Sequence, residues 1–109
     1  MTTKSLSVNY TNTQTDTPQI VFTAGDPIKI DAFTATNNSN VNASFKAYIV
    51  PMGENPENPT IPFEVVVWGE NKLGIGLVNQ VIPKGGSLQV ESSTTGAIYF
   101  TISGREIEE

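Results

Sequence analysis

The feature that most constrains the fold is the spacing of short apolar runs, each of which ends within about ten residues at a turn-forming cluster. In the first run Leu6, Val8 and Tyr10 alternate with polar residues, and later runs end at Gly-Asp-Pro (25–27) or Pro-Lys-Gly-Gly (83–86). Side chains of a strand point alternately to its two faces, while Gly, Pro and Asn supply the backbone dihedrals of turns. The pattern therefore predicts β-strands joined by turns and disfavours long helices.

Eight segments share this character. They span residues 5–10, 19–24, 28–36, 43–50, 63–68, 73–82, 87–92 and 97–102. About eight short, mainly antiparallel strands favour an all-β fold, either a β-sandwich or a jelly-roll-like arrangement. A chain of 109 residues has room for one core. We therefore expect a single domain over 1–109, with an extended N-terminal segment (1–18) and an acidic C-terminal tail (104–109).

Three segments carry more specific expectations. Residues 63–68 (FEVVVW) form the most β-prone run, so we place this strand near the centre of a sheet. Residues 73–82 contain two glycines that disfavour a helix, so we expect a strand that bends or bulges there. Residues 52–62 combine prolines with acidic side chains, which is typical of an exposed, semi-rigid loop.

The strand at 28–36 allows an expectation about single side chains. Strict alternation places Ile28, Ile30, Ala32 and Thr34 on the same side of this strand. Lys29 and Asp31 then lie on the other side.

The chain contains neither Cys nor His, which narrows its chemistry. Without these residues it lacks a thiol nucleophile, the usual ligands of transition metals and the most common acid or base near neutral pH. Carboxylates remain, but most lie in predicted turns, where solvent keeps them ionised. The sequence also lacks a calcium loop of the Asp-x-Asp-x-Asp-Gly type. We therefore expect no catalytic residues, no cofactor and no metal.

The balance of charged residues limits the kinds of partner that the chain can bind. Six basic residues stand against 11 acidic ones, giving a net charge of -5. Such a surface repels phosphate backbones, so we expect no nucleic-acid partner. No stretch approaches the length of a membrane span, and the first ten residues lack the apolar run of an export signal. We expect no membrane partner and no cleaved leader.

The aromatic residues are the candidates for protein contacts. Trp68 follows the run FEVVV, which favours a place in the core, while the alternative is an exposed anchor for a sugar or a protein. Tyrosine is enriched at interfaces, and tyrosines occur on three predicted strands. We name as candidate subunit or shell contacts Tyr10, Tyr48, Trp68, Tyr99 and Arg105.

Three segments carry a resemblance to a known group of proteins. They are AYIVP at 47–51, IPKGG at 82–86 and IYFTISGREI at 98–107. Through these three segments, in this order along the chain, the sequence resembles small virion proteins of tailed bacteriophages that have β-sandwich or jelly-roll-like folds. The resemblance covers about the last two-thirds of the chain, and its motifs are short.

The resemblance implies a non-enzymatic virion protein. The preferred role is a capsid cement, or decoration, protein that binds the major capsid protein and stabilises the head as a homo-oligomer. The virion would be its location, after assembly in the host cytoplasm. A tail, neck or baseplate component is an alternative. A different class of function, carbohydrate binding with Trp68 and a tyrosine as stacking platforms, also remains open. The resemblance supplies no catalytic residue.

Overall fold

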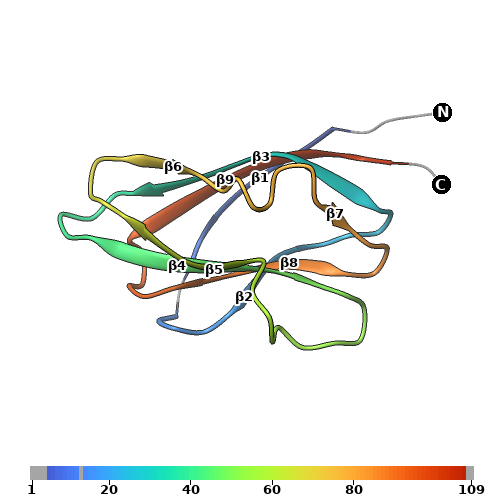
Figure 1. The fold of residues 1–109 in the computed structure, drawn as a ribbon, viewed down its shortest axis with the longest axis horizontal. Helices are drawn as coiled ribbons and strands as arrows, with labels where there is room; N and C mark the ends of the chain where they lie inside the picture. The colour runs from blue at the N-terminus through green and yellow to red at the C-terminus, as the bar shows by residue number, and fades with distance from the viewer. Residues whose placement is uncertain (1–4, 13, 108–109) are drawn as a thin grey trace.

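The chain forms two antiparallel β-sheets that face each other across one core (Figure 1). The structure is a computed structural model and describes residues 5–12 and 14–107. Its strands are β1 (Ser5–Thr11), β2 (Gln19–Thr23), β3 (Ile28–Asn37), β4 (Ala43–Val50), β5 (Ile61–Val66), β6 (Asn71–Leu73), β7 (Val81–Ile82), β8 (Ser87–Ser92) and β9 (Ile98–Glu106). The predicted all-β sandwich is confirmed.

The order of strands defines two sheets, which we call sheet A and sheet B. Sheet A has five strands in the order β1-β9-β3-β6, and β7 also pairs with β3. Sheet B has four strands in the order β2-β8-β4-β5. Every pair of strands is antiparallel. The described strands that end the sheets are therefore β1, β6 and β7 in sheet A, and β2 and β5 in sheet B.

Three phenylalanines form the centre of the core. Phe33 of β3 and Phe100 of β9 come from sheet A, and Phe45 of β4 comes from sheet B. Their ring centroids are 5.4 to 5.8 Å apart, and each ring is at most 1% exposed. Tilted and edge-on rings at this spacing gain aromatic attraction beyond the burial of their area. This cluster joins the two sheets.

A bulge in β3 changes which of its side chains are buried. Opposite β9 the register shifts between Ile30 and Ala32, so Asp31 is the extra residue. Ile28 and Ile30 are buried before the bulge, whereas Phe33 and Ala35 are buried after it. The prediction that Ala32 and Thr34 lie on the same side as Ile28 is therefore wrong. One inserted residue moves every later side chain to the other face.

Strand β5 ends sheet B, so its predicted place near the sheet centre is wrong. It pairs only with β4 among the described residues. Val66 is fully buried, but Val65 and Val67 are 42% and 41% exposed. The apolar run resembled a strand buried on both faces, while the structure buries one face.

The segment 73–82 is two short strands around a turn, so the predicted continuous strand is wrong. Residues 75–79 form the turn between β6 and β7. Within it Leu77 is fully buried, and its amide donates to the carbonyl of Gly74 at 2.9 Å. The amide of Gly74 in turn donates to the carbonyl of Phe33 at 2.9 Å. A Cβ at Gly74 would collide with the ring of Phe33, so only glycine fits this approach without rearrangement.

Both predicted terminal segments contribute strands. Strand β1 occupies residues 5–11 of the N-terminal segment, and β9 continues to Glu106 within the expected acidic tail. After β9 the amide of Ile107 donates to the carbonyl of Pro27 at 2.8 Å. Residues 1–4 and 108–109 lie outside the described residues.

Candidate interaction surfaces

Trp68 lies on the surface, and its predicted place in the core is wrong. Its side chain is 60% exposed. Strand β5 ends at Val66, and the chain turns at Trp68 and Gly69 toward β6. Gly69 has a φ of 78°, the left-handed region that glycine adopts most readily. In a longer strand Trp68 would point to the same face as Val66 and enter the core. Because the strand ends at Val66, this alternation stops before Trp68.

The buried side chain of Asn37 fixes the loops around Trp68. Asn37 is 2% exposed, and its Nδ2 donates to the carbonyls of Val41 at 2.7 Å and Val66 at 2.8 Å. Its Oδ1 accepts from the amide of Ser39 at 2.9 Å and from the Ser39 hydroxyl at 2.7 Å. The backbone carbonyl of Asn37 also accepts from the amide of Gly69 at 3.3 Å. One satisfied amide thus links the β3–β4 loop to the β5–β6 turn.

The two linked loops carry three exposed apolar residues, Val41, Val67 and Trp68, which we call the Trp68 cluster. The three side chains are 55%, 41% and 60% exposed. Figure 1 shows the two loops side by side at one end of the sandwich. Tryptophan presented on a fixed backbone is the residue most enriched among the hot spots of protein interfaces. The Trp68 cluster is therefore the strongest candidate contact surface.

The other predicted contact residues lie apart from this cluster. Tyr10 packs against the core as a half-buried side chain of β1. Tyr99 is 38% exposed, and it pairs with Thr36 on the outer face of sheet A. Arg105 lies six residues farther along β9, about 20 Å away. Its Nη2 is 3.7 Å from Oδ1 of Asp31. The structure does not gather these residues into one site.

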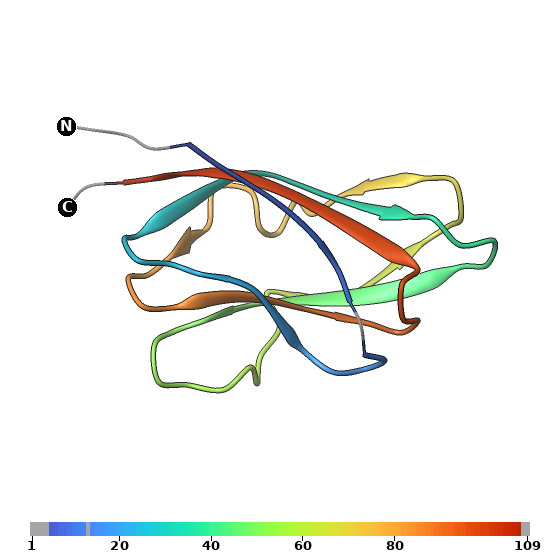
Figure 2. The same cartoon turned by 180° about the vertical axis from the view of Figure 1, so that it is seen from behind.

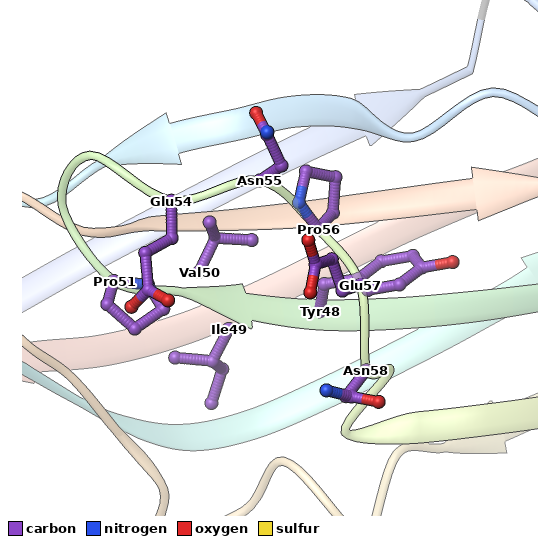
Figure 3. A pocket seen from close by; sticks show the side chains of 9 residues that line it. All are labelled: Tyr48, Ile49, Val50, Pro51, Glu54, Asn55, Pro56, Glu57 and Asn58. Atoms are coloured by element: carbon purple, nitrogen blue, oxygen red, sulfur yellow. The ribbon is translucent and has the colours of Figure 1, made fainter.

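Tyr48 lies under a loop on the outer face of sheet B (Figure 3). After Pro51 the chain folds back across β4, so that Tyr48 is only 6% exposed. The predicted loop is largely exposed, as expected, but it also covers part of the sheet. Tyr48 therefore offers little surface to another protein. A pocket of about 230 Å³ remains between loop and sheet, lined by residues 48–51 and 54–58.

The electrostatics around Tyr48 favour its neutral form. Its hydroxyl donates to Oε1 of Glu91 at 2.9 Å, and Nζ of Lys46 lies 3.8 Å from Oε2 of the same carboxylate. Burial, the hydrogen bond to Glu91 and the charge of Glu91 together raise the pKa of Tyr48 from 10.0 to about 12. A phenol that keeps its proton in this way is a poor base at neutral pH. The hydrogen bond links β4 to β8, and Tyr48 is one of the residues that line the pocket.

Neither a cluster of metal ligands nor a membrane-spanning helix is found among the described residues. Across 5–12 and 14–107, no group of three or more acidic side chains is placed to hold a metal ion. In the same part of the chain, no helix has the length and hydropathy needed to cross a membrane.

Comparison with known proteins gives a likeness in fold. No family model matches the chain, and no curated protein matches it. A solved structure described by the words "Bacillus endospore appendages form a novel family of disulfide-linked pili" is similar at a TM-score of 0.50. The likeness covers 99% of this chain and 88% of that chain at 10% sequence identity. At this identity the likeness shows the fold alone.

Sequence reasoning missed the residues that build the Trp68 cluster around its tryptophan. Val41 is the single apolar residue in the polar turn NNSNVN, and this isolated position was the sequence feature that could have indicated an exposed contact residue. Asn37, at the start of this turn, gave no sign that it is buried, because asparagine is typical of any exposed turn.

Proposed function

We propose that this chain is a structural subunit of a larger protein assembly, and specifically a capsid cement protein that binds the major capsid protein of a bacteriophage head. The single observation that carries the proposal is the Trp68 cluster. Its side chains are exposed, although the loops that bear them are tied to the buried amide of Asn37. A rigid apolar surface loses little conformational entropy when a partner covers it.

The specific role rests on the resemblance to phage virion proteins in residues 47–51, 82–86 and 98–107. A cement protein binds a preassembled shell from outside. In that position the shell separates it from the packaged DNA, so its net charge of -5 causes no strong repulsion from the phosphates. A tail, neck or baseplate component would use the same surface against a different protein.

The likeness to a pilus protein supports the coarser part of the proposal. A similar sandwich in an appendage indicates that the fold can serve as a repeating subunit. The present chain has no cysteine, so it cannot contribute the disulfide links that the description of that structure names.

The proposal is tested by adding the purified chain to phage heads from the genome that encodes it, after their own copies have been removed. We expect the chain to sediment with the heads at a fixed ratio. Trp68→Ala should weaken binding by about thirtyfold, the loss expected for an interface hot spot. Ile75→Ala is the matched control, because Ile75 is 80% exposed but lies outside the cluster. Equal binding by both variants would contradict the assigned surface.

Carbohydrate binding is the second candidate, and the exposure of Trp68 favours it. However, Tyr48 is covered, and Tyr99 lies on the outer face of sheet A rather than in the loops of the Trp68 cluster. A single aromatic platform flanked by valines suits a protein better than a sugar ring. Glycan arrays probed with the wild-type chain and with Trp68→Ala separate the two, since specific binding that depends on Trp68 would favour the sugar.

A further inference from the structure

Most described edges of the two sheets carry a feature that hinders pairing with another strand. Strand β2 has a register irregularity between Ile20 and Phe22. Strand β5 contains Pro62, which has no amide hydrogen, and the charged Glu64. Strands β6 and β7 are three and two residues long. Proline, charge, bulges and short length are the devices by which natural proteins prevent edge-to-edge association.

Strand β1 has none of these devices. It ends sheet A over seven residues, Ser5–Thr11, whose sequence SLSVNYT contains no charge, proline or glycine. All seven residues pair with β9 in unbroken register, from Ser5 opposite Arg105 to Thr11 opposite Tyr99. Figure 2 shows β1 in blue beside β9 in red. A long, regular and uncharged edge is a template for a further strand.

We propose that β1 pairs with β1 of a second copy of this chain, antiparallel and around a two-fold axis at Val8. This inference deepens the proposed function, because it names one partner within the assembly. The two-fold axis places the same patch of both copies in contact, as in most homodimers. Sheet A would then continue from one copy into the next.

Geometry restricts the register of this pairing. Residues opposite each other in a continuous sheet point to the same face, so an even-numbered residue must meet an even-numbered one. With Val8 opposite Val8 of the second copy, all seven residues find partners, while a shift to the next allowed register leaves two unpaired. Ser7 then lies opposite Asn9 of the second copy, and Ser5 opposite Thr11.

The side chains suit this register. Ser5, Ser7 and Asn9 are exposed, so the outer face of the contact would be formed by uncharged groups that hydrogen-bond to each other. On the inner face, Val8 would meet Val8 of the second copy. Each copy has a net charge of -5, and a contact without charged residues brings no like charges directly opposite each other.

The absence of cysteine allows a clean cross-linking test. Cα atoms of directly opposed residues are about 4.5–5.5 Å apart, which a disulfide can span. Val8→Cys should form a covalent dimer on mild oxidation, and a mixture of Ser7→Cys with Asn9→Cys should cross-link between the two variants. Thr101→Cys is the matched control, since Thr101 is exposed and pairs with Asn9 one strand farther in. Failure of both cross-links, or equal cross-linking of the control, would overturn the proposal.

Charge variants test the register itself. Ser7→Lys with Asn9→Lys places two pairs of lysines opposite each other and should raise the dimer dissociation constant about tenfold. Ser7→Lys with Asn9→Glu places opposite charges at the same positions and should restore dimers. The Thr101→Lys variant should associate as the wild type does. Sedimentation velocity of the wild type and the three variants measures their dimerisation. If the Lys/Glu variant dimerises no better than the Lys/Lys variant, this register is refuted.

The outcome is separable from that of the proposed function. Loss of cross-linking with intact binding to heads would remove the two-fold contact and leave the cement role. A β1 dimer that never binds a phage head would leave the contact and remove that role.

Discussion

The hydroxyl of Tyr48 donates a hydrogen bond to Oε1 of Glu91 at 2.9 Å, from a strand of sheet B to its neighbour. Lys46 lies beside the same carboxylate, with Nζ 3.8 Å from Oε2. The three groups form a polar chain across β4 and β8, and Tyr48 at one end of it lies beneath the loop that follows Pro51.

This chain of polar groups predicts a loss of stability in strong alkali. The pKa of Tyr48 is raised to about 12 in the folded protein by burial and by Glu91, from an ordinary value of 10.0. The unfolded chain therefore releases the Tyr48 proton at a lower pH than the folded protein does. The contribution of Tyr48 to the free energy of unfolding is thus complete below pH 10 and is lost as the pH rises toward 12. Urea unfolding at several pH values measures it. Tyr48→Phe should lack this part of the pH dependence, and an identical profile for both proteins would contradict the assignment.

Asn37→Ala should destabilise the protein by about 2–4 kcal/mol. The substitution removes both donors that satisfy the carbonyls of Val41 and Val66 and leaves polar groups without partners. Asn40→Ala is the control, because Asn40 is exposed and its loss should stay within about 0.5 kcal/mol. Denaturant melts give both values, and equal stability of the two variants would argue against a structural role for Asn37.

Trp68→Ala should leave the free energy of unfolding within about 0.5 kcal/mol of the wild type, since an exposed side chain contributes little to the core. The chain has one tryptophan, so its fluorescence reports this position alone. We expect acrylamide to quench the native protein nearly as well as the unfolded one. Strong protection from quenching in the isolated chain would place Trp68 in a buried position, against the structure.

Gly74→Ala should cost about 1–3 kcal/mol through overpacking. The new methyl group would overlap the ring of Phe33 and press on Ile61. Gly25→Ala is the matched substitution, because nothing lies within 4 Å of the added atom. Thermal unfolding of the two variants should differ clearly, and a neutral Gly74→Ala would mean that the β6–β7 turn packs less closely than described.

Glu64→Gln should change stability by less than about 1 kcal/mol. Glu64 of β5 and Lys72 of β6 join the edges of the two sheets, with 3.5 Å between Oε2 and Nζ. Both side chains are about 40% exposed (39% and 41%), and solvent screens such a pair. Melts at low and high salt should differ little. A loss of several kcal/mol would show that this pair closes the side of the sandwich.

The sequence predicted the class of fold because alternation in segments such as 43–50 is a direct consequence of strand geometry. It failed where the outcome depends on neighbours. Nothing in the run from Ile28 to Thr36 indicates the bulge at Asp31, which arises from pairing with β9. An apolar run such as residues 63–68 indicates burial, but the strand's place in the sheet depends on the order of all strands.

The candidate surface was predictable only in part. Trp68 was among the candidates, yet its exposure follows from a turn that begins after Val66, and the run FEVVV favoured the core. Val41 joins it through the buried amide of Asn37, a contact between two turns that no local pattern encodes. Tyr48 was predicted to contact another subunit, but the chain's own loop covers it.

The central proposal is that this sandwich is a subunit of a bacteriophage head and binds the major capsid protein through the Trp68 cluster. A cryo-EM reconstruction of phage heads from the genome that encodes the chain tests this most directly. We expect density for the sandwich at regular positions on the outer shell, with the Trp68 cluster against the major capsid protein. Heads whose outer surface lacks this chain, or bound copies with Trp68 facing solvent, would contradict the claim.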